Sequence, residues 1–149
     1  MKKLLSEWRR YIIESQTEFN GILMLKPNIN TLSYLESIQA MLPEEAVRIS
    51  LEDLHVTLLH QSVLKPFQNK IRDLTMPEPP QIKIDNEVFE RRSPGKKSWA
   101  VRLSNQDEIR QYVFNVLEML GSNNLDPEPE RRFHVSLANL TGKPKDSVR

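Results

Sequence analysis

The strongest constraint on the fold is an alternation of apolar and polar residues that occurs twice in the chain. Side chains of a β-strand point alternately to its two faces, so this alternation predicts a strand with one face in the core. The two segments are 54–59, which reads Leu-His-Val-Thr-Leu-Leu, and 133–137, which reads Phe-His-Val-Ser-Leu. Each segment therefore turns its apolar residues to one face and a histidine with a hydroxyl residue to the other.

Helical spacing of apolar residues predicts several helices outside these strands. The expected segments are 4–12, 32–42, 64–74 and 109–120. Asn30 or Thr31 could cap the second helix, and Pro43 should stop it. Asn105 resembles the first residue of a capping box for the last helix, and Gly121 suits its C-terminal end.

The remaining apolar segments are typical of strands. These are 22–25, and a hairpin that joins 81–90 to 99–103 through the turn at 92–97. The order of elements is helix, then strand–helix–strand, then strand–strand–helix–strand, with irregular structure expected after Leu140. With 149 residues, the chain fits a single domain over 1–149. We therefore expect an α+β fold with two lobes around one cleft, each lobe ending on a histidine-bearing strand.

The composition excludes several classes of function. The chain has no cysteine, which removes disulfides, thiolate nucleophiles and cysteine-ligated metal sites. Its formal net charge is only +1, so a long nucleic acid is not an expected partner. Neither a membrane-spanning apolar run nor a signal peptide is visible, which favours a cytoplasmic protein with no membrane partner.

The two alternating strands share one four-residue frame of histidine, apolar, hydroxyl and apolar residues. The frames are His55-Val56-Thr57-Leu58 and His134-Val135-Ser136-Leu137. If their polar faces meet across a cleft, two imidazoles and two hydroxyls surround one small volume.

These paired frames resemble those of the 2H phosphoesterase superfamily, which is named for its two histidines. The resemblance implies a bilobal fold in which two antiparallel-sheet lobes, flanked by helices, enclose a central cleft. It also implies cleavage of phosphodiesters without a metal or other cofactor. In that reading His55 and His134 form the acid–base pair, and Thr57 and Ser136 bind the phosphate.

Within the superfamily, the chain is similar to small phage nucleases that degrade cyclic-oligonucleotide alarms, the anti-CBASS proteins. Segments 136–142 and 143–148 contribute to this likeness. It implies a phage counter-defence enzyme that cleaves 3′,5′-linked cyclic di- or trinucleotides in the host cytoplasm. Two alternatives stay open: a 2′,3′-cyclic or 2′,5′-phosphodiesterase in RNA end processing, and a module that binds a nucleotide without cleaving it.

The proposed chemistry also agrees with the residue types. Imidazole has an ordinary pKa near 6.5, so a neutral copy can accept a proton while a protonated copy donates one. Hydroxyl groups can donate to the nonbridging phosphate oxygens. The sequence contains no His-x-x-x-His motif and no Gly-rich phosphate loop, so no metal site is expected. The sequence does not decide which histidine is the base, nor the oligomeric state.

Three further residues are candidates for substrate binding. Trp99 follows two lysines and could stack on a nucleobase, or it could lie in the core. Tyr11 could close over a base from the first helix, or pack against the domain. Arg132 lies two residues before His134, so strand alternation predicts that it shares the cleft face.

Four other residues near the frames have less specific expected roles. Arg91, Arg92 and Arg131 could contact phosphates. His60 lies five residues after His55, which gives it the opposite strand parity, so we expect a structural or surface role.

Overall fold

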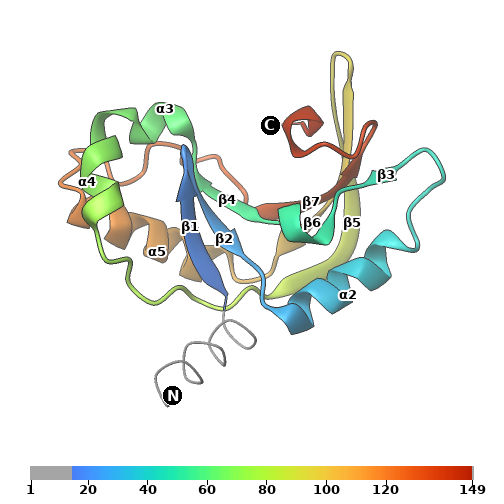
Figure 1. Ribbon diagram of the computed structural model, residues 1–149, viewed down its shortest axis with the longest axis horizontal. Coiled ribbons are helices and arrows are strands. Elements are labelled where there is room, and N and C mark those ends of the chain that lie inside the picture. Colours follow the sequence, from blue (N-terminus) through green and yellow to red (C-terminus); the bar gives the residue numbers. More distant parts are fainter. Residues whose placement is uncertain (1–14, 149) are drawn as a thin grey trace.

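In the computed structural model, which describes residues 15–148, seven strands form one antiparallel sheet (Figure 1). The strand order is β1-β2-β4-β7-β6-β5, and β3 also pairs with β7. The strands are β1 Gln16–Asn20, β2 Ile22–Lys26, β3 Val47–Arg48, β4 Val56–Leu59, β5 Ile84–Ser93, β6 Lys96–Leu103 and β7 His134–Asn139. Every pairing is antiparallel, so the α+β prediction is confirmed.

The strands of the two halves are joined into this single sheet at its centre. β4 belongs to the first half of the chain and β7 to the second, and they pair at Val56 and Val135. The structure thus shows one continuous sheet where two separate sheet lobes were expected, and the two strands that carry the histidine frames are neighbours in its middle.

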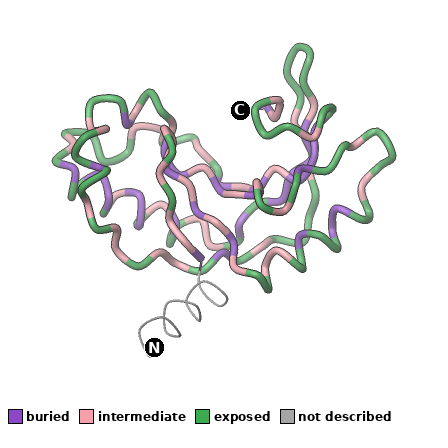
Figure 2. The backbone as a smooth tube through the Cα atoms, viewed as in Figure 1, coloured by how far each residue is buried: buried purple, intermediate pink, exposed green. Residues whose placement is uncertain are grey.

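Helices α2 and α5 cover one side of the sheet (Figure 1). The helices are α2 Ile29–Gln39, α3 Gln61–Leu64, α4 Gln68–Asp73 and α5 Gln106–Met119, with short 3-10 turns at Leu51–Asp53, Lys65–Phe67 and Pro144–Asp146. Leu35 of α2 and Val116 of α5 are fully buried in the same hydrophobic cluster as Val56 and Val135. The core thus lies between the sheet and these helices, and buried segments follow the central strands (Figure 2).

The ends of the helices differ slightly from the expectation. α2 is capped by Asn28, whose Oδ1 accepts a hydrogen bond from the Thr31 amide at 2.8 Å. The predicted caps, Asn30 and Thr31, lie inside the first turn instead, because the helix starts at Ile29. Asn105 does precede α5, and Gly121 follows it with a φ of 76°, a conformation that suits glycine.

Two short strands were not predicted. β1 forms a hairpin with β2 around Gly21, and β3 adds two residues beside β7. Conversely, the helix expected at 4–12 and its Tyr11 lie outside the described residues. No helix within 15–148 is long and apolar enough to cross a membrane.

Candidate active site

The two predicted frames meet on the side of the sheet opposite α2 and α5. Val56 and Val135 form the opposed pair between β4 and β7. In an antiparallel ladder this register brings His55 beside Ser136, and Thr57 beside His134. All four are partly exposed, while their apolar neighbours are buried. Together they line one hollow of about 240 Å³, here called the histidine hollow.

Both histidines are held in the same way by the backbone. Nδ1 of His55 lies 2.8 Å from the carbonyl oxygen of Asp53, and Nδ1 of His134 lies 3.1 Å from that of Arg132. Each carbonyl belongs to the residue two positions before the histidine. Since a carbonyl can only accept, each Nδ1 carries the proton, and Nε2 of the neutral ring keeps its lone pair. The two frames thus match in their supporting contacts as well as in sequence.

The environment lowers the pKa of both imidazoles. Burial is the main cause at His134, where the positive Arg91 and Arg131 lower the pKa further, to about 4. Burial also lowers the pKa of His55, against the opposing effect of its hydrogen bond to the Asp53 carbonyl. Without a bound anion, both rings are therefore neutral at pH 7.

Arg91 of β5 contacts His134 directly, although sequence analysis named it only as one of several arginines that could contact phosphates. Its Nη1 donates to Nε2 of His134 at 2.9 Å and to the Val148 carbonyl oxygen at 3.3 Å. The hairpin register places Arg91 opposite Ser98, on the strand next to β7. A guanidinium beside the imidazoles is well suited to bind a phosphate oxygen. The signal that could have identified it is strand parity across the hairpin, but the register had to be known first.

The C-terminal segment forms one wall of the histidine hollow, where irregular structure was expected. Lys145 and Val148 line the hollow. The fully buried Asn139 organises this segment: its Nδ2 donates to the Lys143 carbonyl at 2.7 Å, and its Oδ1 accepts from the Thr141 amide at 3.0 Å. The Val148 amide donates to Oγ of the buried Ser98 at 2.7 Å, which attaches the segment to β6.

His60 lines the same hollow, although its strand parity predicted a position away from His55 and Thr57. Strand parity fails for it because β4 ends at Leu59 and the chain then turns into α3. His60 is the residue that precedes the first turn of α3, so its direction is set by the helix start and not by the strand.

A larger hollow of about 530 Å³ adjoins the histidine hollow; we call it the arginine hollow. It shares His60, Arg91, Arg131 and His134 with the first hollow. The exposed Arg132 lines the arginine hollow and not the histidine hollow, so it lies beside the candidate site. Its carbonyl holds His134 as described above.

Trp99 is buried away from the site, which corrects the base-stacking expectation. Only 1% of Trp99 is exposed, and it lies beside Ile38 and Glu90 on the side of the sheet that α2 covers. Lys97 lies over its ring at 4.8 Å. The residue of β6 that reaches the site is Arg102, which pairs with His134 and lines the arginine hollow. Arg92 lies outside both hollows and bonds Glu90 at 3.1 Å.

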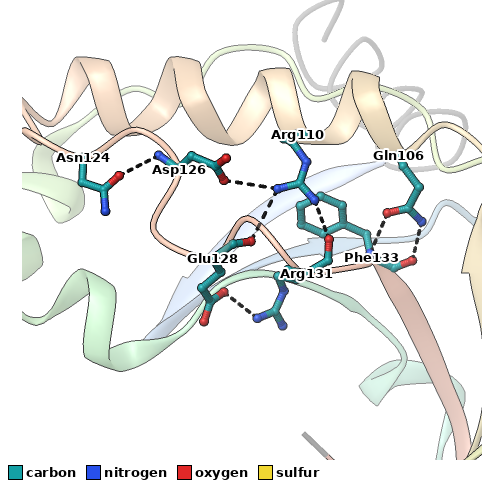
Figure 3. A network of polar contacts seen from close by, with 7 residues as sticks. All are labelled: Gln106, Arg110, Asn124, Asp126, Glu128, Arg131 and Phe133. Atoms are coloured by element: carbon teal, nitrogen blue, oxygen red, sulfur yellow. Dashed lines mark hydrogen bonds and ion pairs between the residues drawn. The ribbon is translucent and has the colours of Figure 1, made fainter.

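Helix α5 fixes the loop that leads into β7 (Figure 3). The Gln106 amide group both accepts from the Phe133 amide at 2.7 Å and donates to the Phe133 carbonyl at 2.8 Å. Arg110 pairs with Asp126 at 3.3 Å. The two Gln106 bonds hold the backbone of Phe133, the residue directly before His134, and so help to position the imidazole.

The described part of the chain contains no group of three His, Asp or Glu side chains placed to hold a metal ion. No protein-family model, curated protein or solved structure matches the chain. The character of the site therefore follows from its own geometry: two histidines and two hydroxyls on adjacent strands, facing one hollow bordered by arginines.

Proposed function

We propose that this protein is a metal-independent phosphodiesterase of the bilobal 2H type, which cleaves cyclic oligonucleotide signals as a phage counter-defence enzyme. The observation that carries the proposal is that His55, Thr57, His134 and Ser136 line one hollow from neighbouring strands. In both imidazoles Nδ1 bonds a backbone carbonyl, which leaves Nε2 as the nitrogen that can transfer a proton. Arg91 adds a fixed positive charge for the phosphate.

The reaction begins with a neutral His134 and a protonated His55. Nε2 of His134 takes the proton of the substrate 2′-hydroxyl, and the 2′-oxygen forms a bond to phosphorus. The bond from phosphorus to the 5′-oxygen breaks, and His55 gives its proton to that oxygen. One strand end is then a 2′,3′-cyclic phosphate and the other a 5′-hydroxyl, and the two imidazoles have exchanged protonation states.

The electrostatics favour this assignment of roles. The pKa of His134 is about 4, so its lone pair stays available at neutral pH. On substrate binding, the Arg91 guanidinium that bonds this lone pair transfers its hydrogen bond to a nonbridging phosphate oxygen. The negative phosphate raises the pKa of a nearby imidazole, which enables His55 to carry a proton in the complex. Thr57 and Ser136 supply hydroxyl donors to the same phosphate.

The direct test is an assay on 3′,3′-cGAMP, cyclic tri-adenylate and 2′,3′-cyclic nucleotides in the presence of EDTA. We expect turnover of a cyclic oligonucleotide, and a loss of about 10²–10⁴-fold in His55→Ala and in His134→Ala. Circular dichroism should show that both variants remain folded. Arg92→Gln, outside both hollows, is the control that should retain full activity. No turnover of any substrate, or full activity in both histidine variants, contradicts the proposal.

A second candidate function is nucleotide binding without cleavage. The observation that favours it is the resting state: both imidazole pKa values are lowered, and Arg91 bonds the nitrogen of His134 that would transfer a proton. Tight binding of cyclic dinucleotides with no product, in the wild type as in the variants, would support this function. If linear RNA with a 2′,3′-cyclic end is consumed in preference to cyclic dinucleotides, RNA end processing is the better description.

A further inference from the structure

The arginine hollow concentrates positive charge next to the histidine pair. Four arginines and two glutamates line it, a formal balance of +2, whereas the whole chain carries only +1. One of these glutamates, Glu128, is bonded to Arg131 at 2.7 Å. The excess charge therefore belongs to the other arginines of the hollow.

Arg102 and Arg132 hold the part of this charge that no carboxylate neutralises. Both are exposed, and among residues 15–148 neither forms an ion pair. Arg110, close by, shows the contrast, because it is paired with Asp126. Exposed guanidinium groups that share a concave surface attract anions, and they match phosphate geometry well.

Arg102 is also held in a defined position beside the histidine pair. Its guanidinium carbon lies 4.4 Å from the centre of the Phe89 ring. That ring makes an edge contact with the His134 imidazole, with 6.2 Å between their centres. β6 pairs Arg102 directly with His134. The side chain is thus preorganised by stacking and by the sheet, which reduces the entropy lost when it binds a ligand.

We propose that the arginine hollow is a second phosphate subsite, in which Arg102 and Arg132 bind a phosphate next to the scissile one. This inference rests on the proposed function for the position of the first phosphate. The two hollows share His134 and Arg91, so one ligand can extend through both. The preferred substrate class is then a nucleotide with at least two phosphodiesters, and ligands with one phosphodiester use only the histidine hollow.

Cyclic di-AMP and linear 3′,5′-ApA provide a matched pair of ligands, since they share both bases and differ by one phosphodiester. Their binding is measured by calorimetry in the His55→Ala background, so that neither ligand is consumed. Arg102→Gln and Arg132→Gln should each weaken the binding of cyclic di-AMP by about tenfold, and change that of ApA by less than about twofold. Arg92→Gln is the matched control and should affect neither ligand.

The outcomes separate the subsite from the activity. If Arg102→Gln and Arg132→Gln leave cyclic di-AMP binding unchanged, or weaken both ligands equally, the second subsite is wrong. Circular dichroism of each variant excludes unfolding as the cause of a loss. Turnover by the wild type is measured separately on the substrates named under the proposed function: if none of them is cleaved, the proposed function fails, while selective loss of cyclic di-AMP binding still establishes the subsite.

Discussion

A single hydrogen bond determines which chemistry is open to His134 in the free protein. The imidazole receives an N–H from Arg91 at Nε2 and gives its own N–H to the Arg132 carbonyl, so both of its nitrogens are engaged. Protonation of this ring would set a cation against the fixed guanidinium of Arg91. His134 therefore rests as a base, and an anion that attracts Arg91 exposes its lone pair.

Arg91→Gln should raise the pKa of His134 above its value of about 4. The substitution removes a positive charge next to the ring, while the burial that contributes most to the lowered pKa remains, so the value should stay below 6.5. Titration of the imidazole signals by NMR measures this directly. Arg92→Gln removes an exposed charge on the same strand and serves as the control. An unchanged pKa in Arg91→Gln would mean that Arg91 does not contribute to the shift.

At the scale of elements, the C-terminal segment depends on a close approach to β3. Gly142 has a φ of 81°, and a Cβ built there would lie 2.9 Å from Cγ1 of Val47 and 3.1 Å from the Arg48 carbonyl oxygen. Gly95, in the β5–β6 turn, has a similar φ of 75° but nothing within 4 Å of such a Cβ. Substitution of either glycine thus strains the backbone, but only at Gly142 would the added Cβ also clash with neighbouring atoms.

We expect Gly142→Ala to lower the free energy of unfolding by about 2–4 kcal/mol, and Gly95→Ala by only about 1 kcal/mol. Urea denaturation of the two variants measures the difference, which isolates the steric contribution. Gly142→Ala should also reduce turnover, because the segment that it displaces lines the histidine hollow. Equal destabilisation by the two substitutions would show that β3 and the C-terminal segment move apart at little energetic cost.

The elements that the sequence predicted are those with a periodic apolar face. The helix at 109–120 and the strand at 133–137 have buried faces at the expected spacing, and both were confirmed. β1 was missed because Gln16–Asn20 contains a single large apolar residue, and β3 because its two residues are both exposed. An edge strand or a two-residue strand is formed by backbone pairing with a partner, which leaves no period in its own sequence.

The site shows the same division between local and non-local information. Strand parity was enough to group His55 with Thr57, and His134 with Ser136, because the members of each pair are two residues apart in or directly beside one strand. Arg91 and the C-terminal wall come from other elements, and only the register of β5, β6 and β7 brings them to the hollow. A register shift between Trp99 and Ala100 skips one residue of β7, so the partners along the two strands do not follow from their sequences. Pairing of this kind is a property of the tertiary fold.

On the scale of the whole molecule, the candidate site lies where the two halves of the chain join. The first half contributes β4 and the second contributes β7, and one hydrophobic cluster extends beneath both. Neither half alone brings the two histidines together. Stability and site geometry are therefore linked, and the partly buried imidazoles should also affect the pH dependence of folding.

His134 should make the folded protein less stable as the pH falls below about 6.5. Its pKa is about 4 when folded and near 6.5 when unfolded, so between these values the unfolded chain binds the proton and the folded one does not. The free energy of unfolding should therefore decrease by about 2 kcal/mol from pH 7 to pH 5 through this residue. Because the pKa of His55 is lowered too, it acts in the same direction.

His134→Gln separates this effect from the titration of other groups. The variant cannot take up the proton, so urea denaturation at pH 7 and pH 5 should show a loss smaller than that of the wild type by about 2 kcal/mol. His55 and the carboxylates are present in both proteins, and their contributions cancel in the comparison. If both proteins lose the same stability, the ring is accessible to water and protons in the folded state. The assignment of His134 as a base with a lowered pKa beside Arg91 would then be wrong, and His134 could act as the acid instead.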